Sequence, residues 1–178
     1  RKAVEQGRQA MDSISKRGSA ETPLDVVIIG AGPAGISATL AAMHHGLRYI
    51  TIEQEDTFGG STLHYPRGKV VMTAPMNLPI IGKIKVTEIT KEELMDIWKD
   101  VVAKSGIRIN FAERMEKIER RGDALNVTTT RASYLTRSVL LSIGRRGTPR
   151  KLDVSGEELG KVVYRLIDPE QYKNMHVL

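Results

Sequence analysis

A run of small residues has the spacing of a phosphate-binding turn. Three glycines are spaced as Gly-x-Gly-x-x-Gly in the run Gly30, Ala31, Gly32, Pro33, Ala34 and Gly35. In this pattern the first glycine permits a tight turn from a strand into a helix, and the second lets the backbone approach a pyrophosphate without a Cβ in the way. The third lets the helix pack closely on the strand, and the alanines and proline contribute only backbone and shape. The partial positive charge at the helix N-terminus favours phosphate. The alternative is a chance glycine-rich turn.

An acidic residue about twenty positions after the turn completes the pattern of a dinucleotide site. Glu53 follows a second apolar stretch, and its carboxylate can accept hydrogen bonds from a ribose diol. The neighbouring Gln54 could support the ribose or face water, and the sequence leaves both open. The elements that must position these residues are a strand over residues 26–29, a helix that ends near Gly46, and a strand over residues 49–52.

Composition excludes several classes of function. The 178 residues are 40% hydrophobic and 27% charged, which is ordinary for a soluble chain of one domain or slightly more. No apolar run approaches the roughly 18 to 20 residues that span a bilayer, and no signal peptide is visible. The chain has no cysteine, which excludes a disulfide framework, a cysteine-ligated iron–sulfur cluster and a redox-active CxxC within it. We expect a cytoplasmic protein.

Charge and aromatic content argue against nucleic acid as a partner. The net charge of +6 is spread over the chain, and aromatic residues make up only 4% of it, with no basic-aromatic stacking pattern. His44 and His45 have no third ligand at matching spacing, so no metal site is predicted. No Ser/His/Asp or Cys/His set and no carboxylate pair has the spacing of a catalytic site. We therefore predict no catalytic side chain.

The remaining pattern predicts an α/β fold. An amphipathic helix is expected over residues 1–17, weakened by Gly7, and a linker over residues 18–23. Residues 56–86 are rich in proline and glycine and predict an excursion over the ligand face without regular elements. Thr90 and Glu93 form a capping box for a helix over residues 91–104, in which Trp98 is a core residue.

Strands follow this helix. Residues 107–111 are expected to add a third strand to the nucleotide-binding sheet, and residues 114–119, 124–130 and 133–135 to form a small antiparallel meander. A further strand is predicted over residues 138–143, and a short helix between residues 164 and 172. The last four residues look like the start of another buried strand, so we expect a truncated chain. The fold class is a Rossmann-like three-layer domain with a mainly parallel sheet and an antiparallel meander.

Four segments together resemble the two-dinucleotide-domain flavoprotein reductases of the pyridine nucleotide–disulfide oxidoreductase type, nearest the thioredoxin-reductase-like branch. The first is the glycine run with Glu53, and the second is the run from Gly59 to Thr62. The third is the strand that ends at Gly144. The fourth comprises residues 148–150 and 156–157, where Ser155 replaces the proline usual in the family. The helix over the first residues is also similar to the closing helix of such domains, and a simple linker helix is the alternative.

The resemblance implies an FAD site. The glycine run and Glu53 would bind the pyrophosphate and the adenosine ribose. Gly59, Gly60 and Thr62 would meet the flavin side of the cofactor, Met115 would recognise adenine through its backbone, and Gly144 would let the backbone approach the cofactor. The domains expected are a helix and linker at residues 1–23, an incomplete FAD-binding domain at 24–156, and a connector with the first strand of an NAD(P)H-binding domain at 157–178.

The resemblance also implies an activity for the complete protein. Electrons would pass from NAD(P)H through FAD to a disulfide, a redox protein or another acceptor, and the flavin rather than a side chain would carry them. This segment alone is expected to be inactive. A homodimer is left open. Two alternatives remain: a non-catalytic module that binds FAD or NAD, and a dehydrogenase without flavin that binds NAD at the same glycine run.

Overall fold

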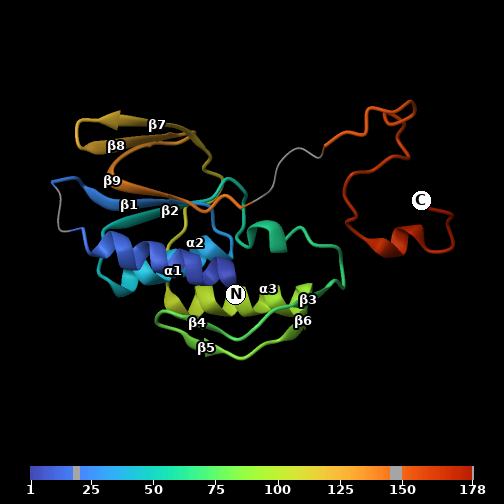
Figure 1. Cartoon of the computed structure of the whole chain (residues 1–178), viewed down its shortest axis with the longest axis horizontal. Helices are drawn as coiled ribbons and strands as arrows, with labels where there is room; N and C mark the ends of the chain where they lie inside the picture. The colour runs from blue at the N-terminus through green and yellow to red at the C-terminus, as the bar shows by residue number, and fades with distance from the viewer. Residues whose placement is uncertain (18–20, 145–149, 178) are drawn as a thin grey trace.

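A five-stranded sheet forms the centre of the computed structural model, which describes residues 1–17, 21–144 and 150–177. The strand order is β2-β1-β9-β8-β7 (Figure 1). The strands are β1 (Leu24–Ile29), β2 (Tyr49–Ile52), β7 (Met115–Arg121), β8 (Ala124–Thr129) and β9 (Ser133–Leu141). The predicted α/β fold with parallel strands and an antiparallel meander is confirmed.

Strand β9 joins the parallel and antiparallel halves of this sheet. It runs parallel to β1, with Ser138 beside Val26 and Leu141 beside Ile29, and antiparallel to β8. Separate strands over residues 133–135 and 138–143 were predicted, and this division was wrong. Thr136 interrupts the apolar pattern, but it pairs with Leu24 of β1 and with Leu125 of β8 at once. Pairing on both sides keeps the strand continuous through its polar residues.

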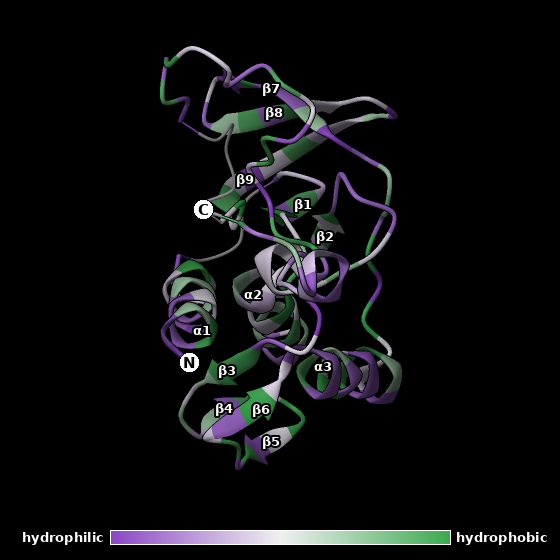
Figure 2. Ribbon diagram, turned by 90° about the vertical axis from the view of Figure 1, so that its right-hand side faces the viewer, coloured by the Kyte–Doolittle hydropathy of each residue, from purple (hydrophilic) through white to green (hydrophobic). Residues whose placement is uncertain are grey.

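Three helices lie on one side of the parallel strands, and the β7–β8 end of the same sheet folds over their other side (Figure 2). The helices are α1 (Lys2–Ser15), α2 (Pro33–His44) and α3 (Lys91–Ser105). Val26 and Ile28 of β1 pack under α1 and α2 against Met11 and Ala38. Alternate residues of the same strand point the other way, so Val27 and Ile29 pack with Val127 of β8. The result is the three-layer arrangement that the sequence predicts.

Helix α3 begins and ends as its sequence predicts. The Thr90 backbone N–H donates to the Glu93 carboxylate at 2.9 Å, and the Glu93 N–H donates to Thr90 Oγ1 at 3.3 Å, which completes the capping box. Gly106 ends the helix in the left-handed conformation, with φ +67°. Trp98 is 1% exposed in the core between α1, α2 and α3, so its predicted role as a core residue is confirmed.

The segment before α3 holds more regular structure than predicted. It contains the short 3₁₀ turn η1 (Gly60–Thr62) and the strands β3 (Val70–Met72), β4 (Met76–Leu78), β5 (Gly82–Ile84) and β6 (Glu88–Thr90). The prediction of an irregular excursion over residues 56–86 was therefore wrong. A strand forms at Met76 and Leu78 because these two residues alternate with an exposed one and are buried against the helices. Prolines 75 and 79 flank β4 and take no place in its ladder.

The prediction of a third parallel strand over residues 107–111 was also wrong, because these residues do not form a regular strand. Only Asn110 forms a bridge, parallel to Ile52. The segment does lie at the edge of β2, because the Asn110 N–H donates to Thr51 O at 2.8 Å and the Glu53 N–H donates to Asn110 O at 2.8 Å. Ala112, at φ +51°, then turns the chain away before a ladder can extend.

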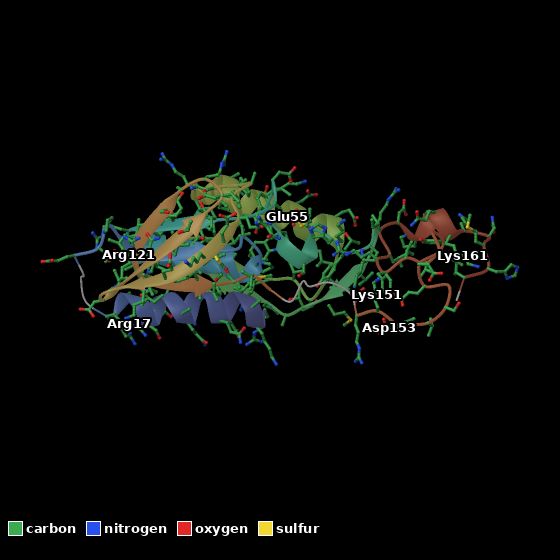
Figure 3. All side chains as sticks on the ribbon, turned by 90° about the horizontal axis from the view of Figure 1, so that it is seen from above. Arg17, Glu55, Arg121, Lys151, Asp153 and Lys161 are labelled. Atoms are coloured by element: carbon green, nitrogen blue, oxygen red, sulfur yellow. The ribbon has the colours of Figure 1, made fainter. Side chains whose placement is uncertain are left out.

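Residues 150–177 leave the sheet and project from it (Figure 3). They include the short helix η2 (Pro169–Tyr172), which confirms the helix expected between residues 164 and 172. Residues 175–177 form no strand, so the buried terminal strand is not borne out among the described residues, and residue 178 lies outside them. Part of the linker (18–20) and residues 145–149 are also outside the described residues. The division at residue 156 stays a prediction.

No helix in the described part of the chain is long and apolar enough to cross a membrane.

Candidate functional site: the carboxyl edge of the parallel strands

The predicted phosphate turn, residues 30–35, leads from the end of β1 into α2. Gly30 adopts φ +103°, and a Cβ on it would lie 2.6 Å from the Ser142 carbonyl oxygen. A Cβ on Gly35 would overlap the Gly30 carbonyl oxygen, so α2 approaches β1 as closely as glycine allows. Both glycines are therefore required by backbone contacts. Pro33 begins the helix after Gly32, where its missing N–H costs no hydrogen bond.

Glu53 lies against this turn rather than free in solvent. It is 7% exposed, and its Oε2 accepts a hydrogen bond from the Ala31 N–H at 2.6 Å. Its Oε1 accepts from the Glu55 N–H at 3.1 Å. A carboxylate has about four lone-pair sites, so two remain for other donors. The structure thus brings the predicted ribose acceptor to the phosphate turn and adds a second role, because the carboxylate holds the turn beside the end of β2.

The predicted flavin-side segment, residues 59–62, folds over the phosphate turn and is named here the Gly-Gly turn. The Gly59 N–H donates to Ala31 O at 2.9 Å. Gly59 and Gly60 both have positive φ, and a Cβ on Gly60 would lie 3.1 Å from the Gly32 Cα. Thr62 is 9% exposed, and its hydroxyl donates to Gly59 O at 2.6 Å. Two segments predicted separately therefore meet backbone to backbone at Gly32.

The end of β9 reaches the same place. Ser142 follows the strand, and its hydroxyl lies 2.8 Å from Ile29 O and 2.9 Å from Gly30 O, so it can donate to either carbonyl. Its N–H donates to Ile29 O at 2.8 Å. Gly144 is exposed at φ +69°, and a Cβ on it would lie 3.7 Å from Ser61 Oγ of the Gly-Gly turn. The sequence analysis did not identify Ser142 as a site residue, although the strand predicted over residues 138–143 contains it.

The predicted adenine-side residue, Met115, lies farther out. It begins β7 and packs beside the cluster of Ile29, Ile52 and Val127. The chain reaches it past Glu113, whose N–H donates to Glu53 O at 2.9 Å. Met115 is therefore beside the β2 end of the site. Gln54 is exposed, and its side chain donates to the neighbouring Glu55 carboxylate at 3.4 Å.

Glu113 is a second residue that the sequence analysis missed. It is 2% exposed, and its Oε1 accepts from Thr129 Oγ1 at 2.7 Å and from the Tyr134 hydroxyl at 2.8 Å. Burial raises the pKa of Tyr134, and the hydrogen bond and charge of Glu113 raise it further. This buried carboxylate ties the 110–113 segment to β8 and β9. The position of Glu113 just before the predicted meander was the one hint in the sequence. It did not identify the partners, because Thr129 and Tyr134 are distant in sequence.

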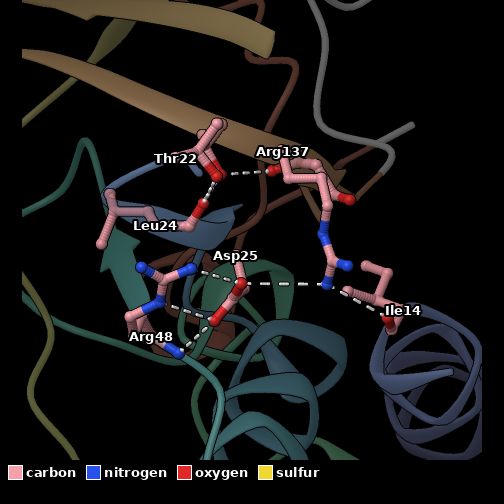
Figure 4. A network of polar contacts seen from close by, with 8 residues as sticks. Ile14, Thr22, Leu24, Asp25, Arg48 and Arg137 are labelled. Carbon is pink, nitrogen blue, oxygen red and sulfur yellow. Dashed lines mark hydrogen bonds and ion pairs between the residues drawn. The ribbon is translucent and has the colours of Figure 1, made fainter. Parts of the chain in front are cut away.

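The opposite edge of the sheet is built from charged side chains (Figure 4). Asp25, 7% exposed at the start of β1, accepts from the Arg48 backbone N–H and guanidinium at 2.9–3.1 Å. Arg137 of β9 lies 3.9 Å from the same carboxylate and donates to Ile14 O at the end of α1 at 3.3 Å. The Arg48 guanidinium holds the pKa of Asp25 below its ordinary value. This network fastens α1, β1 and β9 together away from the site.

The carboxyl edge offers backbone groups rather than reactive side chains. The N-terminus of α2 points its partial positive charge toward the turn, as in sites that bind phosphate. Within the described residues, no group of three or more histidine, aspartate or glutamate side chains could hold a metal ion. The arrangement can hold an anionic ligand in place.

The parallel strands, the glycine turn and the helix that follows define a Rossmann-like α/β unit. A family model described as pyridine nucleotide-disulphide oxidoreductase matches residues 27–178. The chain belongs to this family, which confirms the resemblance seen in the sequence.

Curated relatives are reductases about twice as long. The ferredoxin–NADP reductase of Lactococcus lactis is 29% identical over 160 residues, which are 86% of this chain and 47% of the relative. The thioredoxin reductase of Treponema pallidum is 30% identical over 162 residues, covering 89% of this chain and 48% of that one. The chain thus spans about half the length of the relatives it matches.

Solved structures share the fold. Bacillithiol disulfide reductase from Bacillus cereus has a TM-score of 0.70 at 23% identity, over 83% of this chain and 48% of that one. A structure of OTEMO in complex with FAD and NADP has a TM-score of 0.61 at 16% identity, over 77% of this chain and 28% of that one.

Proposed function

We propose that this chain is the FAD-binding portion of an NAD(P)H-dependent flavoprotein oxidoreductase. The observation that carries the proposal is the meeting of three backbone segments at one edge of the sheet: the phosphate turn, the Gly-Gly turn and residues 142–144. Family membership and the reductase names of the relatives support the same reading.

The residues present fit FAD. Gly32, Pro33 and Ala34 are partly exposed, so the first turn of α2 is open to a pyrophosphate. Gly32 carries no Cβ and is in contact with the backbone of Gly60, so backbone rather than side chain borders this part of the site. Glu53 keeps two lone-pair sites for the adenosine ribose. The Gly-Gly turn and Gly144 would lie toward the flavin, and Met115 toward adenine. The cysteine-free chain has no thiol of its own to reduce.

Bound FAD would supply the hydride chemistry, accepting electrons from NAD(P)H and passing them on. The residues of this chain would hold and orient the cofactor. The phosphate turn would neutralise the pyrophosphate with backbone N–H groups, and Glu53 would fix both the ribose and the Ala31 amide. In the whole protein a disulfide or redox protein would receive the electrons. A homodimer and a cytoplasmic location belong to the same proposal.

The alternative is a non-catalytic module that binds FAD or NAD. It is compatible with the sequence-based prediction of no catalytic side chain, which a flavoprotein shares.

Absorbance of the purified chain tests the proposal. Titration with FAD should give a complex that keeps flavin absorbance between about 350 and 500 nm after gel filtration and bleaches with dithionite. Protein that stays colourless and binds NAD instead would favour a nucleotide module without flavin and contradict the proposal.

Two further experiments use the whole protein. Size-exclusion chromatography tests whether it is a dimer. Reduction assays with disulfide and ferredoxin-type acceptors test which partner receives the electrons.

A further inference from the structure

Helix α1 lies outside the segment that the family model matches, yet it is packed along α2. The match begins at residue 27, and α1 covers Lys2–Ser15. Figures 1 and 2 show α1 and α2 side by side beneath the sheet. Val4 and Met11 of α1 are 1% and 0% exposed, so the helix contributes to the core. This element is therefore part of the nucleotide-binding unit rather than a separate linker.

Gly7 of α1 lies against the first turn of α2. A Cβ on Gly7 would overlap the Ala34 carbonyl oxygen and lie 3.0 Å from its carbonyl carbon. Both obstacles are backbone atoms, so neither can rotate away. In the sequence, Gly7 reads only as a weakness of the helix, because alanine is the better helix former. In the structure it permits two helix backbones to touch where the phosphate turn ends.

A second contact holds the same part of α2. Ser37 is fully buried, and its hydroxyl donates to Val4 O at 2.8 Å. Val4 lies in the first turn of α1, so this hydrogen bond joins the backbone of α1 to a side chain of α2. Ala34 and Ser37 are one helical turn apart on one side of α2. Two independent contacts thus connect α1 to the turn that carries the pyrophosphate amides.

The other end of α1 is held at the far edge of the sheet. Arg137 donates to Ile14 O, and Asp12 pairs with His45 at the end of α2 at 2.8 Å. Both ends of α1 are therefore fixed, and its position along α2 is determined.

We propose that α1 sets the position of the phosphate turn, with Gly7 and Ser37 as positioning residues for the cofactor. The inference rests on the proposed function. Because α1 is held at both ends, a Cβ at Gly7 would push Ala34 away and shift the first turn of α2 relative to Gly60 and Glu53. The backbone groups that meet the pyrophosphate then lose their alignment.

The test compares four variants of the full chain with wild type. Gly7→Ala improves intrinsic helix propensity, so a loss of binding cannot come from a weaker helix. Ser37→Ala is a milder variant that removes only a hydroxyl. Gln9→Ala, at an exposed position on α1, is the matched control. Ile14→Ala lowers stability at the far end of α1 without touching Ala34. FAD dissociation constants are measured at a temperature at which every variant is folded by circular dichroism.

Gly7→Ala should raise the FAD dissociation constant about tenfold and Ser37→Ala about threefold, whereas Gln9→Ala and Ile14→Ala should stay within about twofold of wild type. A second measurement needs no cofactor. In ¹H–¹⁵N spectra of the ligand-free chain, Gly7→Ala should shift the amides of residues 30–32, 34–37 and 59–60. Shifts confined to α1, or an Ile14→Ala variant as weak in binding as Gly7→Ala, would overturn the inference. Wild-type protein that binds no FAD would overturn the proposed function instead, while the spectra would still decide the role of α1.

Discussion

The two ends of strand β1 are built by opposite means. At its carboxyl end, glycines 30, 32 and 35 bring backbone against backbone, and the Glu53 carboxylate accepts a hydrogen bond from Ala31 of the turn. At its amino end, Asp25 is surrounded by Arg48 and Arg137, and little of the carboxylate is left for a ligand. The first edge presents backbone groups to a ligand, whereas the second pairs its carboxylate with arginines of the same chain.

This difference separates binding from stability within one sheet. An edge that must accept a phosphate cannot already hold its anion, so its positive potential comes from helix α2 and unpaired amides. An edge that only joins elements can pair its charges with one another, and there Arg137 links α1 to β1 through a hydrogen bond to Ile14 O and an ion pair with Asp25. We therefore expect substitutions at the carboxyl edge to lower mainly the affinity for FAD, and substitutions at the amino edge to lower mainly the free energy of unfolding.

Gly35→Ala should have the largest effect. Its Cβ would overlap the Gly30 carbonyl oxygen, and the turn must open to admit it. We expect FAD affinity to fall at least about 100-fold, with stability lowered by about 1–3 kcal/mol, as for overpacked sites. Isothermal titration with FAD and urea unfolding measure the two changes. Gly160→Ala is the control for adding a methyl group, because this glycine, like Gly35, has no positive φ and no atom lies within 4 Å of the added Cβ. Wild-type affinity in Gly35→Ala would contradict the close packing.

Asp25→Asn should show the reverse signature. The carboxylate is buried and pairs with one half-exposed and one buried arginine, so we expect a loss of about 1–3 kcal/mol of unfolding free energy. FAD affinity should stay within about twofold of wild type, because the network is at the edge away from the site. Urea unfolding and FAD titration of the same preparation check both. A large loss of affinity in a folded variant would show that the two edges are not separate.

The pH dependence sharpens the same contrast. Hydrogen bonds from Arg48 lower the pKa of Asp25 in the folded chain, so the folded state favours its charged form. The stabilisation is therefore present above the ordinary aspartate pKa and is lost as the pH falls through the lower folded value. The gap in unfolding free energy between wild type and Asp25→Asn should be largest near pH 7 and shrink below about pH 4. A gap that stays constant down to pH 2 would contradict the assignment.

Ser142→Ala should have the smallest effect. It removes a hydroxyl that lies between two carbonyl oxygens, Ile29 O and Gly30 O, and leaves the backbone pairing of β9 with β1 in place. We expect a loss of about 1 kcal/mol in stability and about threefold in FAD affinity, since the substitution removes one hydrogen bond to the turn and no group that binds the cofactor. Ser138→Ala, in the same strand, serves as the comparison. Its buried hydroxyl has no hydrogen-bond partner among the described residues, so its removal should not weaken FAD binding.

Local sequence signals predicted the elements that local chemistry determines. Thr90, Glu93 and Gly106 fixed the ends of α3, and the glycine run fixed the start of α2, because caps and turns depend on neighbours within a few residues. The convergence of the Gly-Gly turn and Gly144 on the phosphate turn followed from the family resemblance, and the structure places them together.

Features that depend on distant partners could not be predicted. The continuity of β9 requires β1 and β8 on either side, and the role of Gly7 requires Ala34. Glu113 reads as a surface residue until Thr129 and Tyr134 are placed beside it. In each case the residue type looks unfavourable or neutral locally, and only tertiary contact gives it a function.

A titration of the ¹⁵N-labelled chain with FAD tests the central claim most directly. The amides of residues 30–32, 34–36, 59–62 and 142–144 should shift or broaden together, because the three segments meet at one edge of the sheet. The amides of Asp25, Arg48 and Arg137 at the opposite edge should keep their positions. Saturable shifts at the charged edge, or none in the phosphate turn, would contradict the assignment of this edge as the FAD site.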